Sequence, residues 1–353
     1  MSPGPVGSNG CLQGRRALRS PIVAVAGIVA FLGGVSSGAA SEGRVAAERL
    51  LAGDRPVLAG SEGWLFLPQE LRALLAPRSW DRGAAAPPES DPLPPILDFR
   101  DQLRGAGVEL IVVPVPPKLL LYPERLLPGD AVAQAAELGR ELAALQAELA
   151  RRGLNVLDLA PAFARAKDGA GDPLYCRTDT HWSPRGIALA AGEIAGRIGS
   201  PPWLAGVSRR ALAAAPRELA IEGDLARLLP AAARPPRERL AAEEVAERGA
   251  GAAAPLPPWR ESPVLLLGDS HVLVFHAGGD LHARGAGLPE QLALALGFPL
   301  DVVGVRGSGG TPARVNLMRR GDALAGKKVV VWVLAARELL AGTGWKKVPV
   351  VRR

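Results

Sequence analysis

Two short segments of the chain carry the residue types needed for acyl-group chemistry. Ser270 stands in the segment GDSH (268–271), directly after an apolar run. Asp179 and His181 stand two residues apart in the segment TDTHW (178–182), much earlier in the chain. A hydroxyl, an imidazole base and a carboxylate that orients the base are the three groups that turn a serine into a nucleophile. The sequence therefore raises the hypothesis of acyl-group chemistry.

Apolar runs that alternate with helical patterns predict the elements that must position these residues. The runs are apolar throughout rather than at every second residue, which is typical of parallel strands buried on both faces. We predict a three-layer α/β fold, with a parallel sheet covered by helices on both faces. The predicted strands are 64–67, 108–113, 155–159, 264–267, 301–305 and 329–334, and the predicted helices are 95–104, 138–149, 185–198, 288–296 and 313–324.

Two of the predicted strands end in loops that would meet at one edge of the sheet. Ser270 follows one strand, and the Gly-rich loop 306–310 follows the next. Ligands of such sheets bind outside the carboxyl ends of the strands. The loop could direct backbone N–H groups at a developing oxyanion, or it could be only a tight turn before a helix. It lacks the spacing of a phosphate-binding or dinucleotide-binding loop, and we expect no cofactor.

The position of Asp179 and His181 taken alone allows two interpretations. Pro184 starts a helix just beyond them, so the pair lies on a loop at a helix N-terminus. In one interpretation Asp179 is an ordinary helix cap and His181 a surface imidazole. In the other, Asp179 accepts a hydrogen bond from one ring nitrogen and the second ring nitrogen takes the proton of Ser270.

The N-terminus predicts export. Three arginines within residues 15–19 precede the uncharged stretch 20–41, whose apolar part spans 22–35 and is followed by small residues. This order is typical of a secretory signal, although the stretch approaches the roughly 20 residues that a membrane span requires. We interpret residues 1–41 as a signal peptide or a membrane anchor, with the anchor favoured. Basic residues before the apolar part place the rest of the chain outside the cytoplasm.

Composition argues against two other classes of function. The chain has 42 basic and 35 acidic residues, a net charge of +7, which would favour anionic partners. No basic helix, zinc-ligand spacing or basic strand with aromatic residues accompanies the charge, so we expect no nucleic-acid partner. His271, His276 and His282 recur at short spacing but lack nearby carboxylates suited to one face. We therefore expect no metal site.

The segments around the candidate residues resemble the alginate O-acetyltransferase family, periplasmic proteins of the SGNH-hydrolase-like superfamily that modify exopolysaccharides. Residues 178–186 resemble the Asp-x-His-Trp signature of this family. The similarity extends over about residues 60 to 340. Further matching segments, in order, are 62–67 (Gly-Trp-Leu-Phe), 117–124 (Pro-x-Lys-x-x-x-Tyr-Pro), 222–225 (Gly-Asp-Leu), 307–310 and 331–339.

The resemblance implies a role for each candidate residue. Ordinary SGNH hydrolases begin with Gly-Asp-Ser and end with Asp-x-x-His, whereas here the acid and base come first, as in the permuted acetyltransferase branch. Ser270 would be the nucleophile, His181 the base and Asp179 its orienter. The other implied candidates are Gly310 as an oxyanion contributor and Arg337, Lys118 and Trp182 as substrate-binding residues; a structural ion pair is the alternative for Arg337 and Lys118, and core packing for Trp182.

Four segments follow from this reading. Residues 1–41 are the signal or anchor, and 42–345 form an SGNH-hydrolase-like acetyltransferase domain. Within the domain, residues 201–262 form a Pro-, Ala- and Arg-rich insertion that could be a lid, a partner surface or a poorly ordered segment. Residues 346–353 are a basic tail.

The predicted function is acetyl transfer to hydroxyls of an exported polysaccharide, through an acyl-enzyme on Ser270. The resemblance implies a periplasmic location, anchoring in the inner membrane, and a membrane-bound acyltransferase as acetyl-donor partner. A carbohydrate esterase or deacetylase would use the same triad and admit water in the second step. A non-catalytic scaffold of a polysaccharide-secretion complex is the alternative from another class.

Overall fold

The computed structural model describes Met1 and residues 42–76, 89–249, 256–322 and 324–351. The predicted signal or anchor therefore lies almost wholly outside the described residues. Within the described part of the chain, no helix combines the length and the apolar character needed to cross a membrane.

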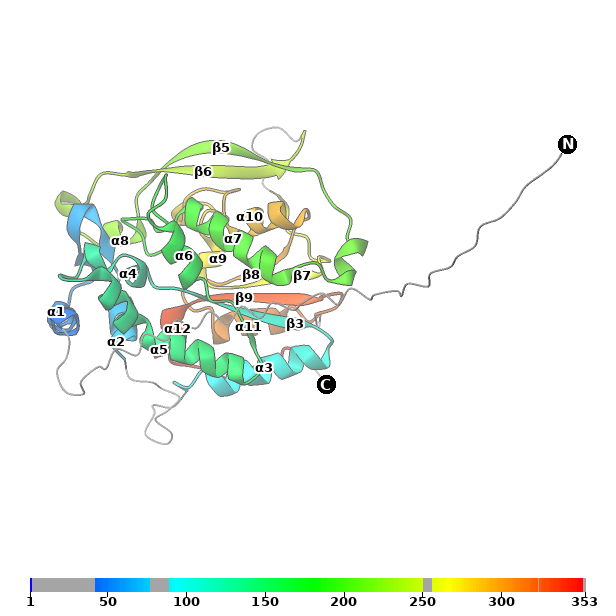
Figure 1. Cartoon of the computed structure of the whole chain (residues 1–353), viewed down its shortest axis with the longest axis horizontal. Helices are drawn as coiled ribbons and strands as arrows, with labels where there is room; N and C mark the ends of the chain where they lie inside the picture. The colour runs from blue at the N-terminus through cyan, green and yellow to red at the C-terminus, as the bar shows by residue number, and fades with distance from the viewer. Residues whose placement is uncertain (2–41, 77–88, 250–255, 323, 352–353) are drawn as a thin grey trace. The chain divides into compact units, whose positions relative to one another are not determined.

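A five-stranded parallel sheet lies at the centre of the domain (Figure 1). Its strand order is β4-β3-β9-β7-β8, and every neighbouring pair is parallel. β9 lies between β3 and β7 and pairs with β3 along its whole length. The strands are β3 (Glu109–Val115), β4 (Asn155–Val156), β7 (Val264–Gly268), β8 (Asp301–Gly304) and β9 (Val329–Ala335).

Helices cover both faces of this sheet, which confirms the predicted three-layer α/β fold. α7 (Pro184–Ile198) and α10 (Leu288–Leu296) lie on one side of the sheet in Figure 1. α3 (Leu93–Gly105), α5 (Ala131–Arg151) and α11 (Thr311–Arg319) lie on the other side. All residues of β7 and β9 are buried, because their apolar side chains face helices in both directions.

Shorter elements connect and extend this core. They include two small antiparallel sheets, β1 with β2 and β5 with β6. The remaining elements are α1 (Glu42–Leu51), β1 (Leu58–Ala59), η1 (Ser61–Gly63), β2 (Leu65–Phe66), α2 (Pro68–Leu75), α4 (Lys118–Leu121), η3 (Pro123–Arg125), α6 (Ala160–Ala166), η4 (Pro202–Gly206), β5 (Leu212–Ile221), α8 (Asp224–Arg227), η5 (Ala231–Ala233), β6 (Glu238–Glu247), α9 (Ser270–Leu273), η6 (Gly279–Leu281) and α12 (Ala336–Ala341).

Several predicted segments differ from the structure, and three of the differences are informative. The predicted strand 155–159 is only two residues long, because Asp158 accepts a hydrogen bond from the N–H of Ala160 and α6 starts there. The predicted helix 313–324 spans Thr311–Arg319 instead. Part of the predicted basic tail packs onto the domain, since Val348 and Val350 are buried.

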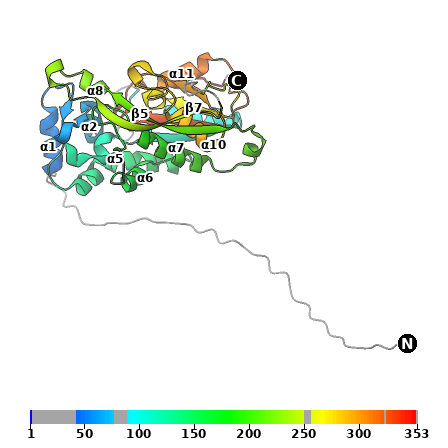
Figure 2. The same ribbon diagram turned by 90° about the horizontal axis from the view of Figure 1, so that it is seen from above.

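The predicted insertion 201–262 contains a long antiparallel hairpin. β5 and β6 pair over ten residues each, so this part of the insertion is not poorly ordered. The hairpin lies over α7 and α10, on the side away from the central sheet, and Figure 2 shows β5 running across these helices. Leu219 of β5 and Leu240 and Val245 of β6 are buried. Regular pairing and one apolar face explain how a Pro- and Ala-rich segment becomes ordered.

We expect Leu266→Ala in β7 to lower the free energy of unfolding by about 2–5 kcal/mol, because it leaves a cavity among buried neighbours. Chemical denaturation followed by circular dichroism measures this change. The matched control is Leu228→Ala, since Leu228 is 53% exposed and its variant should change stability by less than about 0.5 kcal/mol. Equal losses in the two variants would contradict the burial of β7.

Candidate active site

The loop that carries Asp179 and His181 is closed by a short antiparallel bridge. Tyr175 pairs with Trp182, and the N–H of Cys176 donates to the carbonyl of His181 at 3.1 Å. α7 begins directly after this loop, with Ser183 as its N-cap accepting from a helix N–H at 3.2 Å. The loop is therefore fixed at both ends by backbone hydrogen bonds and by the start of a helix.

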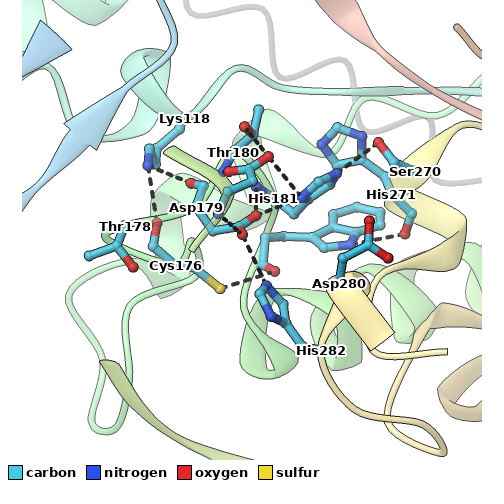
Figure 3. Close-up of polar contacts among 12 residues, drawn as sticks. Lys118, Cys176, Thr178, Asp179, Thr180, His181, Ser270, His271, Asp280 and His282 are labelled. Atoms are coloured by element: carbon cyan, nitrogen blue, oxygen red, sulfur yellow. Dashed lines mark hydrogen bonds and ion pairs between the residues drawn. The ribbon is translucent and has the colours of Figure 1, made fainter. Parts of the chain in front are cut away.

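Ser270 lies at the first residue of α9, immediately beyond the carboxyl end of β7. Its Oγ is 2.7 Å from Nε2 of His181, although the two residues are 89 positions apart. Nδ1 of His181 is 2.6 Å from Oδ1 of Asp179 (Figure 3). The structure thus brings together the three side chains selected from the sequence, in the order in which a serine nucleophile needs them.

The Asp179 carboxylate accepts four hydrogen bonds. Oδ1 accepts from the backbone N–H and the imidazole Nδ1 of His181, at 3.0 and 2.6 Å. Oδ2 accepts from the backbone N–H of Asp224 at 2.7 Å and from Nε2 of His282 at 2.9 Å. Burial raises the pKa of Asp179, but His181 and His282 outweigh it and hold this pKa well below its usual range. The group is a carboxylate at neutral pH.

The same contacts set the basicity of His181. Burial lowers the pKa of His181, but the charge of Asp179 and the hydrogen bond to it outweigh burial, so the pKa is raised. Asp224 and Asp269 act in the same direction. With Nδ1 directed at the carboxylate, Nε2 is the nitrogen that can exchange a proton with Ser270.

A second histidine and carboxylate flank the serine. Nδ1 of His271 is 2.9 Å from Oδ1 of Asp269, and Oδ2 of Asp269 accepts from the N–H of Ala335 at 2.7 Å. Burial raises the pKa of Asp269, but His271 outweighs it, so the pKa falls to about 2. Burial lowers the pKa of His271, whose ring centroid lies 5.0 Å from that of His181. This neighbour of His181 is thus favoured in its neutral form.

Comparison with known proteins assigns the chain to a family. Residues 57–336 match the family model described as "SGNH hydrolase-like domain, acetyltransferase AlgX". The chain belongs to this family. Among curated relatives, it is 30% identical over 175 residues to "Probable alginate O-acetylase AlgJ" of Pseudomonas syringae pv. tomato, which covers 49% of this chain and 41% of that protein. It is 33% identical over 131 residues to the protein of the same name from Pseudomonas fluorescens, covering 37% of this chain and 32% of that one.

Two solved structures share the fold of this AlgX-family chain. The O-acetyltransferase domain of Pseudomonas putida AlgJ matches with a TM-score of 0.61 at 23% identity, over 80% of this chain and 91% of that one. Pseudomonas aeruginosa AlgX matches with a TM-score of 0.56 at 18% identity, over 82% of this chain and 67% of that one. The sequence alignments with the first curated relatives, by contrast, cover only 41% and 32% of those proteins' length.

Lys118 of this AlgX-family domain is not placed to bind substrate. Its ammonium group is buried and donates to the carbonyls of Cys176, Arg177 and Asp179 at 3.0, 3.3 and 2.7 Å. All three N–H donors are therefore used on the site loop, as the left part of Figure 3 shows for two of them. The prediction of a substrate contact is wrong, and Lys118 instead holds the backbone that carries Asp179.

Trp182 is also not a sugar-stacking surface. Its side chain is fully buried, and its indole N–H donates to the carbonyl of His271 at 3.2 Å. The alternative of core packing is correct, because a sheltered indole has no free face for a ligand.

The roles suggested for Arg337 in substrate binding and for Gly310 at the oxyanion stay predictions. Arg337 lies 3.8 Å from the Glu70 carboxylate, with 17% of its side chain exposed, which agrees with the ion-pair alternative. Gly310 precedes α11 and lies against Trp345. Gly309 approaches the serine segment, since a Cβ on it would lie 3.0 Å from the backbone N of Asp269.

Each of the three closely spaced histidines contacts a carboxylate, which their spacing in the sequence did not reveal. His271 and His282 contact Asp269 and Asp179, and Nδ1 of His276 is 2.6 Å from Glu290. These pairs are separate, so they do not form one ligand set. Ligand atoms of Asp179, His181 and Asp224 lie within 4.8 Å of one another, but they already hydrogen-bond to each other or to Thr180. We assign no metal or cofactor to them.

The insertion supplies two carboxylates that sequence analysis missed as site residues. Asp224, just after β5, accepts from the N–H and the hydroxyl of Thr180, both at 2.7 Å. Glu238, at the start of β6, accepts from the N–H groups of Arg177 and Thr178 at 2.9 and 3.2 Å. The only sequence signal was the family-like segment around Asp224. The hairpin therefore supports the site loop from outside.

We expect Lys118→Met to lower the free energy of unfolding by about 2–4 kcal/mol, because three carbonyls of the site loop, two of them in buried hydrogen bonds, lose their donor. Thermal and denaturant unfolding measure the change. Lys346→Met is the control, since Lys346 is 61% exposed and its ion pair should contribute less than about 1 kcal/mol. A Lys118 variant of unchanged stability that lost only substrate affinity would restore the rejected substrate-binding role.

Proposed function

We propose that this chain is an O-acetyltransferase that moves acetyl groups onto hydroxyls of an exported polysaccharide. The observation that carries the proposal is the continuous chain of hydrogen bonds from Ser270 through His181 to Asp179, at 2.7 and 2.6 Å. Membership of the AlgX acetyltransferase family supports the choice of acetyl as the group transferred. The same geometry argues against a purely structural scaffold, which needs no buried, aligned nucleophile and base.

The proposed reaction has two steps. Oγ of Ser270 attacks the acetyl carbonyl and gives its proton to Nε2 of His181, which passes the proton to the departing group. A sugar hydroxyl then loses its proton to His181 and attacks the acyl-enzyme, and Ser270 leaves with its proton restored. Asp179 balances the imidazolium that forms in each step. The backbone N–H of Ser270, for which the described residues offer no acceptor, is one candidate oxyanion donor. Gly310 is the other, and its N–H would have to exchange a long hydrogen bond to the Ser308 hydroxyl, at 3.4 Å, for the oxyanion.

Two hollows near Asp179 offer room for a hydroxyl-rich acceptor. One has a volume of about 400 Å³ and includes Thr178 in its lining. The second, of about 380 Å³, includes His282. Arg237 lines both hollows, whereas only the first includes residues of the site loop, Arg177 and Thr178. The lining of the second is mostly polar, which supports a polysaccharide rather than an apolar acceptor.

The setting of the reaction follows from the N-terminal segment. We propose that the domain works in the periplasm, held at the inner membrane by residues 1–41, and that a membrane-bound acyltransferase delivers the acetyl group. The order of basic, apolar and small residues in this segment supports the proposal.

Incubation of the purified full-length chain with an activated acetyl ester, with and without oligosaccharides, tests the transfer. We expect acetylated sugar and an acetylated Ser270, and a loss of about a thousandfold or more in Ser270→Ala. The control is Ser262→Ala, because Ser262 is a buried serine two residues before β7, at the opposite end of the strand from Ser270. Release of acetate regardless of sugar would instead indicate an esterase, and no acyl-enzyme in any form would indicate a scaffold.

The pH dependence of the reaction gives an independent test. His181 must be unprotonated to take the serine proton, and its pKa is raised from 6.5, so kcat/KM should fall as the pH drops through a value above 6.5. Rate profiles between about pH 5 and about pH 9 measure this limb. Asp179→Asn should move the limb to lower pH, because it removes the charge that raises the pKa of His181. A limb at the same pH in both proteins would rule out His181 as the titrating base.

A further inference from the structure

His282 reaches the triad from a third part of the chain. It lies 103 residues after Asp179, on the loop that follows α9, and its Nε2 contacts Oδ2 of Asp179 at 2.9 Å. His181 uses the other carboxylate oxygen, Oδ1 (Figure 3). The His282 side chain is 6% exposed, and its ring centroid lies 5.1 Å from that of Phe275. Because Asp179 is a carboxylate, Nε2 of His282 is the donor in this contact.

The backbone holds His282 in a conformation that histidine rarely adopts. Its φ is 72° and its ψ is −123°, and Phe275 on the same loop also has a positive φ, 58°. The N–H of His282 donates to Gly279 at 3.1 Å, and the N–H of Phe275 donates to Leu281 at 2.9 Å. Glycine would occupy such a position without strain. A histidine at position 282 therefore strains the backbone where a glycine would not. The hydrogen bond that its side chain makes is with Asp179.

We propose that His282 is a positioning residue for the acyl transfer proposed above, and that it limits how strongly Asp179 holds a proton on His181. A donated N–H draws negative charge toward Oδ2, so the carboxylate attracts the His181 proton less. The base then stays unprotonated to lower pH than it would with a triad alone. The same hydrogen bond fixes the rotation of the carboxylate, so that Oδ1 faces Nδ1 of His181.

The charged groups around His282 come from several elements. Asp280 lies on its own loop, and Asp224 follows β5 and donates its N–H to the same carboxylate oxygen. The other charged side chains that line the hollow beside the imidazole are Arg217, Glu218, Glu222, Arg227 and Arg237. None of these groups changes when His282 is replaced, so a change in the titration of His181 would report the lost contact itself.

Two substitutions separate the hydrogen bond from the volume of the ring. His282→Met removes the donor and keeps an apolar side chain of similar length, whereas His282→Gln keeps an N–H near the position of Nε2. The matched control is His276→Met, because His276 lies on the same loop and contacts a carboxylate, Glu290, at 2.6 Å, outside the triad. The measurements are the pKa of His181, from NMR of its imidazole nitrogens in the full-length chain, and the pH profile of kcat/KM.

We expect His282→Met to raise the pKa of His181 by roughly half a unit or more, and to move the acid limb of the rate profile by the same amount. The value of kcat should fall about tenfold, as a hydrogen bond to a charged group is lost. His282→Gln should restore most of both, and His276→Met should shift neither. An unchanged or lowered His181 pKa in His282→Met, or a Gln variant that behaves like Met, would overturn the proposal. The NMR titration needs no turnover, so this result is distinct from a failure of the acetyltransferase assay.

Discussion

The structure of the site depends on one buried negative charge, that of Asp179. A carboxylate that is 1% exposed is stable only when its oxygens are fully hydrogen-bonded, and here four N–H groups meet them. The donors come from His181, Asp224 and His282, which belong to the site loop, the segment after β5 and the loop after α9. Satisfying this charge therefore holds three distant parts of the chain at one point, and the base is oriented as a result.

The loop around Asp179 has little regular structure, so its own polar groups must also find partners. Two groups of side chains supply these partners. The buried ammonium of Lys118 donates hydrogen bonds to the carbonyls of the loop, while the carboxylates of Asp224 and Glu238 accept hydrogen bonds from its N–H groups. This division explains why the segment 201–262 matters for the site although it lies outside the central sheet, since Asp224 of α8 and Glu238 of β6 supply the two carboxylates. The insertion therefore supports the site loop.

The sequence predicted what local patterns encode. Apolar runs identified the central strands, and residue chemistry together with a family-like signature selected Ser270, His181 and Asp179. The sequence could not say which way a side chain faces, so Lys118 and Trp182 were predicted to contact substrate although both are buried. His282 and Glu238 were missed because their importance arises from contacts over 103 and about 60 residues, which no local spacing reveals. Asp224 lay in a recognised segment, but only packing gave it a role.

The side chains of Trp182 and His181 together explain why the site loop and the segment around Ser270 stay aligned. His181 contacts Ser270 through its side chain, and the next residue, Trp182, donates to the backbone carbonyl of His271, the residue after the serine. The two links are consecutive in both segments and span the same separation of 89 residues. A single contact would let the imidazole pivot about the hydroxyl, whereas two neighbouring contacts fix both distance and direction. A tryptophan directly after His181 thus has a physical reason, because its buried, rigid ring holds the loop of His181 against the segment of Ser270.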